Sequence, residues 1–211
     1  MHFKDRFDAG KRLAEKLAKY KNKKEAIILA IPRGGLEIGN VLAKELGIAL
    51  DIIIVKKIPF PGNPEYAIGA VGINESIVNE DVARSENVPK SYVDSQIKEL
   101  TKAIKERYDK YRGKKPLPDL KGKIVILTDD GIATGYTMLA AVDIIRKQKP
   151  AEIILAVPVA PAESLDKFIG KVDKIVCLET PEIFFAIGEF YGNFTQVEDD
   201  EAIRLLKEAN K

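Results

Sequence analysis

Short, continuously apolar runs alternate along the chain with longer stretches in which apolar residues recur every three or four positions. The short runs are rich in β-branched residues and lie at 26–31, 51–56, 123–128, 151–159 and 173–178. Because they are apolar throughout rather than at every second position, they are typical of parallel strands buried on both faces. Strand, helix and strand in repetition predict an α/β fold with an open, mostly parallel sheet flanked by helices.

The stretches between these runs carry helix signals. "GLEIGNVLAKELG" keeps its apolar residues near one side and ends on Gly47, which suits a C-cap. A second helix is expected in "TMLAAVDIIRKQ", and a long one from Pro89, since proline is favoured in a first turn. The apolar stripe of the long helix should pack on the protein: Val93, Ile97, Leu100, Ile104, Tyr108 and Tyr111. The opening segment also predicts an amphipathic helix, through Phe3, Phe7, Leu13 and Leu17.

One region interrupts the alternation. Residues 59–88, "PFPGNPEYAIGAVGINESIVNEDVARSENV", contain prolines, glycines and short β-like pieces. They predict a loop and hairpin without a helix, inserted between the second parallel strand and the long helix. No internal repeat or domain linker is evident, so the sequence predicts a single domain over residues 1–211.

Composition narrows the classes of function. With 45% hydrophobic residues among 211, the chain can bury a sizeable aliphatic core. Lys and Arg number 34 against 32 Asp and Glu, which gives no general electrostatic case for binding nucleic acid or a membrane. The single cysteine, Cys177, excludes an intrachain disulfide and a multi-cysteine zinc site. No apolar run approaches the ~20 residues of a membrane span, and the first residues lack a signal peptide's apolar segment. A cytoplasmic location is therefore expected.

The stretch "KIVILTDDGIATGYTM", residues 123–138, carries the candidate chemistry. It follows a buried strand and leads into a helix, and ligands of open α/β sheets bind beyond the carboxyl ends of strands. Main-chain N–H groups and the positive end of the helix dipole suit a phosphate, and Thr134 and Thr137 add hydroxyl donors. Gly131 and Gly135 let the backbone approach a ligand closely.

The paired carboxylates of Asp129 and Asp130 make a different demand. They repel phosphate, and they suit vicinal hydroxyls or a hydrated magnesium ion. A ribose 5-phosphate unit satisfies both demands a few ångströms apart. A Walker A loop fits worse because Tyr136 stands where its lysine belongs. Two other interpretations remain open: an N-capping aspartate in an ordinary turn, and a receiver-type domain, which expects its acidic pair after an early strand.

The string "VILTDDGIATGYT" resembles the phosphoribosyl-pyrophosphate (PRPP) binding motif of type I phosphoribosyltransferases. In that family the two acidic residues hold the ribose hydroxyls, and the TGxT loop holds the 5-phosphate. "AIPRGGLEIG" resembles the family's pyrophosphate loop, and "VKKIPFPGNPEYAIGAV" occupies the place of the next strand and its mobile loop. Nearly the whole chain is similar to a poorly characterised group of predicted phosphoribosyltransferases, whose further patterns match "YRG" and "AIGEFYGNF" here.

The resemblance implies magnesium-dependent transfer of the phosphoribosyl group from PRPP to a nucleobase or another nitrogen nucleophile, with release of pyrophosphate. It implies a core over about 25–178, with hood elements from the N-terminal segment, 59–88 and 179–211. It also implies a homo-oligomer, as a dimer, without nucleic acid or membrane partners. The implied catalytic residues are Asp129, Asp130, Arg33 and Lys57. No residue is named as a direct magnesium ligand, and Asp129 and Asp130 are expected to meet the ion through water. The implied PRPP-binding residues are Gly34, Gly35, Lys56, Gly131, Ala133, Thr134, Gly135, Tyr136 and Thr137.

One departure from the family bears on the acceptor. The residue before TG is an aspartate in 6-oxopurine transferases and Ala133 here, so that route to hypoxanthine or guanine is not expected. Arg112 in "YRG" is a further candidate on resemblance. Candidates for a base-stacking face are Phe60, Tyr66, Phe184, Phe185, Phe190 and Tyr191, each of which also suits core packing.

The alternative function is a non-catalytic sensor of PRPP or a nucleotide on the same fold. Retention of Arg33 and Lys57 favours the enzyme, because an idle relative could lose its basic groups for pyrophosphate. The sequence shows no basic recognition helix, which weakens a role as a DNA-binding regulator.

Overall fold

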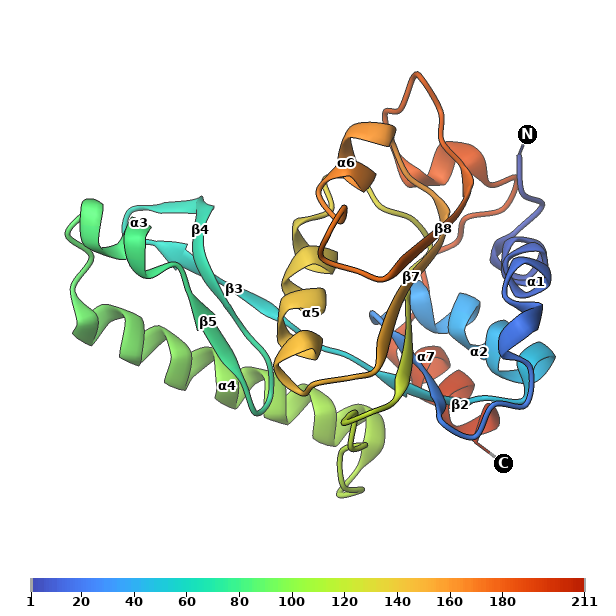
Figure 1. The fold of residues 1–211 in the computed structure, drawn as a ribbon, viewed down its shortest axis with the longest axis horizontal. Coiled ribbons are helices and arrows are strands. Elements are labelled where there is room, and N and C mark those ends of the chain that lie inside the picture. Colours follow the sequence, from blue (N-terminus) through green and yellow to red (C-terminus); the bar gives the residue numbers. More distant parts are fainter. Residues whose placement is uncertain (1, 211) are drawn as a thin grey trace.

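The computed structural model describes residues 2–210 and consists of a parallel sheet with a smaller antiparallel sheet projecting from it (Figure 1). The larger sheet has the strand order β2-β1-β6-β7-β8, and each neighbouring pair is parallel. The predicted open, mostly parallel α/β sheet is therefore confirmed. Its strands are β1 (Ala26–Ala30), β2 (Ala49–Ile52), β6 (Ile124–Thr128), β7 (Glu152–Val159) and β8 (Lys174–Glu179).

Helices cover both faces of this sheet, which explains why its strands are apolar throughout. On β1, Ile28 packs in one core cluster together with α1 and α2, whereas Ile27 and Leu29 pack in a second cluster together with α5. Gly47 ends α2 as predicted, in the left-handed conformation at φ 63°. The helices of this body are α1 (Arg6–Lys16), α2 (Gly35–Leu46), α5 (Tyr136–Lys147), α6 (Ala162–Asp166) and α7 (Asp199–Glu208), with the short 3-10 helices η1 (Ala18–Tyr20) and η2 (Ile187–Phe190).

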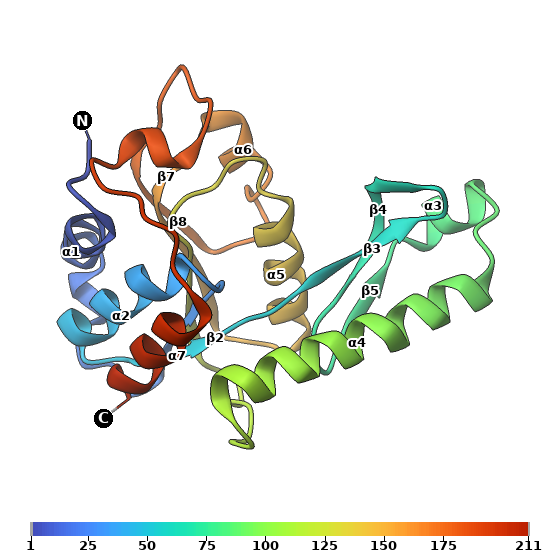
Figure 2. The ribbon, with the colours of Figure 1, turned by 180° about the vertical axis from the view of Figure 1, so that it is seen from behind.

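An arm, residues 56–112, extends away from the parallel sheet, as Figures 1 and 2 show. Its strands pair antiparallel in the order β3-β4-β5, and α4 runs back along them towards α7. The predicted hairpin insertion is thus present. The arm consists of β3 (Lys56–Phe60), β4 (Asn63–Val71), β5 (Ser76–Val78), α3 (Glu80–Ser85) and α4 (Lys90–Arg112).

Two sequence predictions about helices are wrong. Residues 59–88 do contain a helix, α3, because the Asn79 side chain caps it by accepting from the Val82 N–H at 3.1 Å. Phe7 does not share the packed face of the N-terminal helix and is 56% exposed. The helix α1 begins at Arg6, and the Arg6 side chain points into the protein, with 5% of its surface exposed.

The long helix α4 packs as its spacing predicts. Val93, Ile104, Tyr108 and Tyr111 are buried, and the Tyr108 hydroxyl accepts from the Ile54 N–H at 3.1 Å. These contacts fix α4 against the end of β2. Within residues 2–210, no helix is long and apolar enough to cross a membrane. The assignment of core and hood segments within one domain stays a prediction.

Candidate active site

The carboxyl ends of β1 and β6 bring the two sequence motifs together. After β1, the Pro32–Arg33 peptide bond is cis, and α2 begins at Gly35 with Gly34 as its N-cap. A Cβ atom added to Gly34 would overlap the Asp130 carboxylate, and one added to Gly35 would lie 3.0 Å from Oδ1 of Asp129. Glycine is thus needed at Gly34 for the loop to pass so close to the acidic pair.

Arg6 of α1 reaches the same point from a distant part of the sequence. Its Nε donates to Oδ2 of Asp130 at 2.9 Å, and its Nη2 lies 2.9 Å from the same oxygen. Its Nη1 donates to Oε2 of Glu37 at 3.2 Å and to the main-chain oxygen of Thr195 at 2.9 Å. The guanidinium carbon also lies 3.8 Å from the centre of the Phe194 ring. Arg6 therefore links α1, α2, the acidic pair and the C-terminal segment.

The two aspartates differ in their surroundings. Burial, followed by the neighbouring charge of Asp130, raises the pKa of Asp129 well above its usual range. Burial also raises the pKa of Asp130, but the Arg6 guanidinium opposes that rise. The Tyr191 hydroxyl donates to the main-chain oxygen of Asp130 at 2.6 Å, and Oδ1 of Asp129 accepts the Asp130 N–H at 2.9 Å. Asp130 is thus fixed by Arg6, while Asp129 is half-buried.

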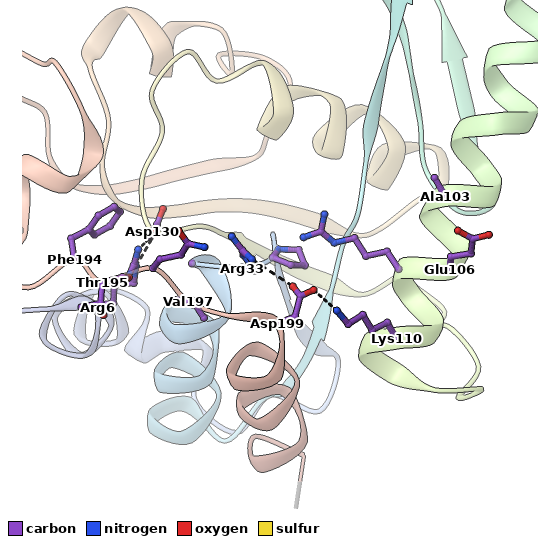
Figure 3. Close-up of a pocket in the computed structure, with 14 residues that line it drawn as sticks. Arg6, Arg33, Ala103, Glu106, Lys110, Asp130, Phe194, Thr195, Val197 and Asp199 are labelled. Carbon is purple, nitrogen blue, oxygen red and sulfur yellow. Dashed lines mark hydrogen bonds and ion pairs between the residues drawn. The ribbon is translucent and has the colours of Figure 1, made fainter.

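A cavity of about 970 Å³ borders Asp130 and the loop of residues 32–34, here called the cis loop (Figure 3). Its other walls are α4 and the C-terminal segment, residues 194–199. Arg33 lies on it, with Nη1 at 3.7 Å from Oε2 of Glu198 and 3.9 Å from Oδ1 of Asp199. The cavity therefore combines cationic and anionic side chains from five parts of the chain. Its lining is Arg6, Pro32, Arg33, Gly34, Ala103, Glu106, Arg107, Lys110, Asp130, Phe194, Thr195, Gln196, Val197 and Asp199.

The glycine-threonine loop continues from Asp130 to the start of α5. Gly135 stands as the N-cap of α5 at φ 79°, and no side chain caps the helix. Two carbonyl oxygens of the loop accept hydrogen bonds from side chains. Ser164 Oγ donates to the main-chain oxygen of Ala133 at 2.5 Å, and Lys167 Nζ donates to that of Thr134 at 2.7 Å. Thr134 and Thr137 are exposed, and the N–H groups in the first turn of a helix have no acceptor within the helix. The loop therefore presents donors outwards.

Two further residues of the loop, Gly131 and Tyr136, lie outside the cavity lining. Gly131 is buried, and a Cβ atom there would meet Ile187 of η2 at 2.8 Å. Tyr136 is 55% exposed, and its ring lies under the Lys167 ammonium at 4.5 Å. Neither residue lines the cavity beside Asp130.

Lys56 and Lys57 lie apart from the cavity lining. The predicted second strand, 51–56, is in fact Ala49–Ile52, because its pairing with β1 stops where β1 ends, at Ala30 opposite Ile52. The chain then leaves the sheet, and both lysines belong to β3 of the arm. Neither lines the cavity, so the structure does not bring them together with Arg33 there.

Arg112, a candidate on resemblance, has structural contacts instead. Its Nε lies 2.7 Å from Oδ1 of Asp51, and both side chains are about nine-tenths buried. Its Nη1 and Nη2 donate to the main-chain oxygens of Lys115 and Pro116 at 3.1 and 2.8 Å. It thus anchors the segment after α4 to β2, away from the lining of the cavity.

The aromatic candidates also divide. Phe184 and Phe190 stack on each other with ring centres 5.6 Å apart, Phe185 is 81% exposed, and Tyr191 is buried. None of them lines the cavity, whereas Phe194, which sequence reasoning missed, does. Phe60 and Tyr66 contact each other in the arm at 5.6 Å.

Sequence reasoning also missed Arg6, Arg107, Lys110 and Asp199. One signal was available for α4, where the lining residues Ala103, Glu106, Arg107 and Lys110 recur at spacings of three and four and so share one helix face. No local signal marked Arg6, because its partners are 31 to 189 positions away.

Comparison with known proteins agrees with this geometry. The family model described as "Phosphoribosyl transferase domain" matches residues 2–192. A curated protein of Mycobacterium tuberculosis, "Putative phosphoribosyl transferase Rv0571c", is 37% identical over 210 residues, which are 99% of this chain and 47% of that protein. The chain therefore spans about half the length of the curated relatives it matches.

Two solved structures are similar to this chain. The crystal structure of TT1426 from Thermus thermophilus is 35% identical, with a TM-score of 0.89 and 99% of both chains covered. The AQ2163 protein of Aquifex aeolicus is 20% identical with a TM-score of 0.50, over 82% of this chain and 73% of that one, and shows likeness of fold alone. From the family match and the Mycobacterium relative, this chain belongs to the phosphoribosyl transferase domain family.

Proposed function

We propose that this chain transfers the phosphoribosyl group of PRPP to a nitrogen nucleophile, a nucleobase or a similar acceptor, and releases pyrophosphate. The observation that carries the proposal is the meeting of three parts: the acidic pair, the Gly34–Gly35 loop pressed against it, and the donor loop that follows. PRPP presents two hydroxyls, a pyrophosphate and a 5-phosphate around one ribose, which these three parts complement.

The acidic pair and the donor loop hold the ribose 5-phosphate portion in this proposal. Asp129 and Asp130 accept hydrogen bonds from the ribose hydroxyls, and Arg6 keeps the Asp130 carboxylate in place. The N–H groups at the start of α5, with the Thr134 and Thr137 hydroxyls, donate to the 5-phosphate.

In the reaction, the bond between the anomeric carbon and the pyrophosphate oxygen breaks, and its electron pair leaves with pyrophosphate. The acceptor nitrogen supplies the electron pair of the new bond. Positive charge grows on the ribose in between, and a nearby carboxylate stabilises it without reorganising. Arg33, on the cavity wall, stabilises the departing pyrophosphate by a charge-assisted contact.

Magnesium fits this site as an ion that arrives with the ligand. Among the residues described, no three His, Cys, Asp or Glu side chains are grouped as metal ligands. Magnesium commonly keeps several of its waters and binds substrate phosphates. In this proposal Asp129 and Asp130 would meet it through those waters. When bound, it would supply positive charge to the leaving pyrophosphate.

Calorimetric titration of PRPP, with and without magnesium, tests the proposal. We expect magnesium-dependent binding that is lost in the Asp129→Asn, Asp130→Asn double variant and kept in Asp109→Asn, a change on the exposed surface of α4. A panel of bases scored by pyrophosphate release then separates the enzyme from the sensor. If PRPP binds but no base in the panel leads to release of pyrophosphate, the sensor is favoured. Equal affinity for PRPP in the double variant and the unaltered chain would refute the ribose site.

A further inference from the structure

Two walls of the cavity carry cations. Arg33 comes from the cis loop, and Arg107 and Lys110 come from consecutive turns of α4. The fourth lining cation, Arg6, is already matched by Asp130 and Glu37. The other three therefore provide the positive charge that is available to a ligand in this cavity.

Asp199 lies between Arg33 and Lys110, as Figure 3 shows, and lines the same cavity as Arg107. Its Oδ2 is 2.5 Å from Nζ of Lys110, and its Oδ1 accepts from the Tyr111 hydroxyl at 2.6 Å and lies 3.9 Å from Nη1 of Arg33. Lys110 remains 54% exposed in its side chain, so the pair is open to solvent and to exchange.

Arg107 forms no ion pair within 4.0 Å among the side chains that the structure describes, although its charge helps to lower the pKa of Asp199 after the larger effects of Lys110 and Tyr111. Its nearest ring contact is Tyr111, whose centre lies 5.8 Å from Cζ of Arg107. An exposed guanidinium beside a cavity, with no carboxylate at ion-pair distance, can turn an N–H edge towards an incoming phosphate.

We propose that Arg107 and Lys110 of α4 bind the pyrophosphate group of PRPP from the side opposite Arg33, and that Asp199 occupies this anion position in the ligand-free chain. On binding, Lys110 exchanges the Asp199 carboxylate for a phosphate oxygen. The inference rests on the proposed function and deepens it, because it adds two residues outside the family-like motifs to the pyrophosphate end of the site.

A purely structural role for Asp199 makes a different prediction. As the first residue of α7, its carboxylate is favourable at the positive end of the helix dipole, and it ties α7 to α4. In that case its removal would change the stability of the chain and leave affinity for anions as it was.

The test is calorimetric titration of inorganic pyrophosphate, ribose 5-phosphate and PRPP, each with magnesium. The variants are Arg107→Met and Lys110→Met, with Lys105→Met as the matched control, since Lys105 is exposed on α4 outside the cavity lining. We expect each of the first two to weaken pyrophosphate and PRPP by about tenfold or more, from loss of a charge-assisted contact. Ribose 5-phosphate should stay within about twofold, as should all ligands with Lys105→Met.

Asp199→Asn should change the affinity for pyrophosphate in the opposite direction, because it removes the carboxylate that competes with pyrophosphate for Lys110. It should tighten pyrophosphate about threefold or more, the size expected for losing one exposed ion pair. Tyr111→Phe breaks the other hydrogen bond to Asp199 without changing charge, so it controls for loosening of α7 and should leave the affinity for pyrophosphate unchanged.

The outcomes separate the inference from the proposed function. If the unaltered chain binds PRPP but Arg107→Met and Lys110→Met bind pyrophosphate as well as Lys105→Met does, only the inference is overturned. Weaker pyrophosphate binding by Asp199→Asn would overturn the exchange. If the unaltered chain binds none of the three ligands, the proposed function fails and the inference fails with it.

Discussion

Replacing Arg6 by methionine would remove the cation on which the acidic site depends. The apolar side chain can keep a contact with the Phe194 ring, but the Asp130 carboxylate, with 13% of its side chain exposed, would lose its charged partner. Glu37 would lose the same partner, although 27% of its side chain is exposed and water can compensate in part. Breaking a buried ion pair by removing one partner costs about 3–5 kcal/mol, so we expect the free energy of unfolding to fall by about that amount near neutral pH.

The loss should depend on pH in a defined direction. Burial raises the pKa of both Asp130 and Glu37, and in each case the Arg6 charge opposes the rise. Without Arg6 both pKa values would rise further. A carboxyl whose folded pKa exceeds its unfolded value favours the folded state at low pH, and this contribution is lost as the pH rises through the folded pKa. The deficit of Arg6→Met should therefore be small near pH 4 and grow towards neutral pH.

Urea unfolding followed by circular dichroism, at about pH 4 and about pH 7.5, measures this deficit. The matched control is Arg12→Met on the same helix, where a half-exposed pair with Asp8 at 2.6 Å should contribute less than about 1 kcal/mol. Adding Asp130→Asn to Arg6→Met should restore part of the stability near neutral pH. A loss no larger than that of Arg12→Met, or a loss independent of pH, would refute the assignment of Arg6 as the partner of a buried charge.

Three further outcomes follow from the same contacts. Gly34→Ala should abolish PRPP binding, because its Cβ would overlap the Asp130 carboxylate; wild-type affinity by calorimetry would contradict the packing of loop against acidic pair. Arg112→Met removes a buried ion pair with Asp51, so it should lower the free energy of unfolding by about 3 kcal/mol and leave the affinity for PRPP unchanged. Reduced affinity in the folded variant would instead place Arg112 in the site. Hydrogen bonds from Lys110, then Tyr111, lower the pKa of Asp199 to about 2. The difference in free energy of unfolding between wild type and Asp199→Asn should therefore be present at neutral pH and vanish as the pH falls from about 4 towards 2. A difference that persists at about pH 2 in acid unfolding would contradict this contribution of Asp199.

The sheet could be predicted because its signals are local. Each parallel strand is a continuous apolar run, and β1 shows why, since Ile27 and Ile28 face different core clusters. The end of β2 could not be predicted in this way. The run continues apolar to Val55, but the strand stops at Ile52 because its neighbour β1 stops at Ala30, which is information held by another segment. The helix α3 was missed because its six residues carry no apolar period, only the cap at Asn79.

The same distinction between local and distant signals applies to the site. Asp130, Gly34 and Arg33 stand in motifs whose spacing can be interpreted, and all three border one cavity. Arg6 stands in no motif, and Phe194 ends the family-like string "AIGEFYGNF" without any signal for its partner. Their contact arises because folding brings residues 188 positions apart within 3.8 Å. For such contacts the composition of the local sequence holds no signal.

The surroundings of Phe194 connect the two ends of the cavity. Its ring is 37% exposed and lines the cavity, but the Arg6 guanidinium lies over it at 3.8 Å and the Tyr191 ring lies 5.1 Å away. Under the proposed function, an acceptor base that stacked on Phe194 would have to share it with Arg6, whose other edge holds Asp130. Any displacement of the ring by the acceptor would then loosen the cation that orients the ribose carboxylate. Arg6 therefore couples the aromatic wall of the cavity to its acidic pair.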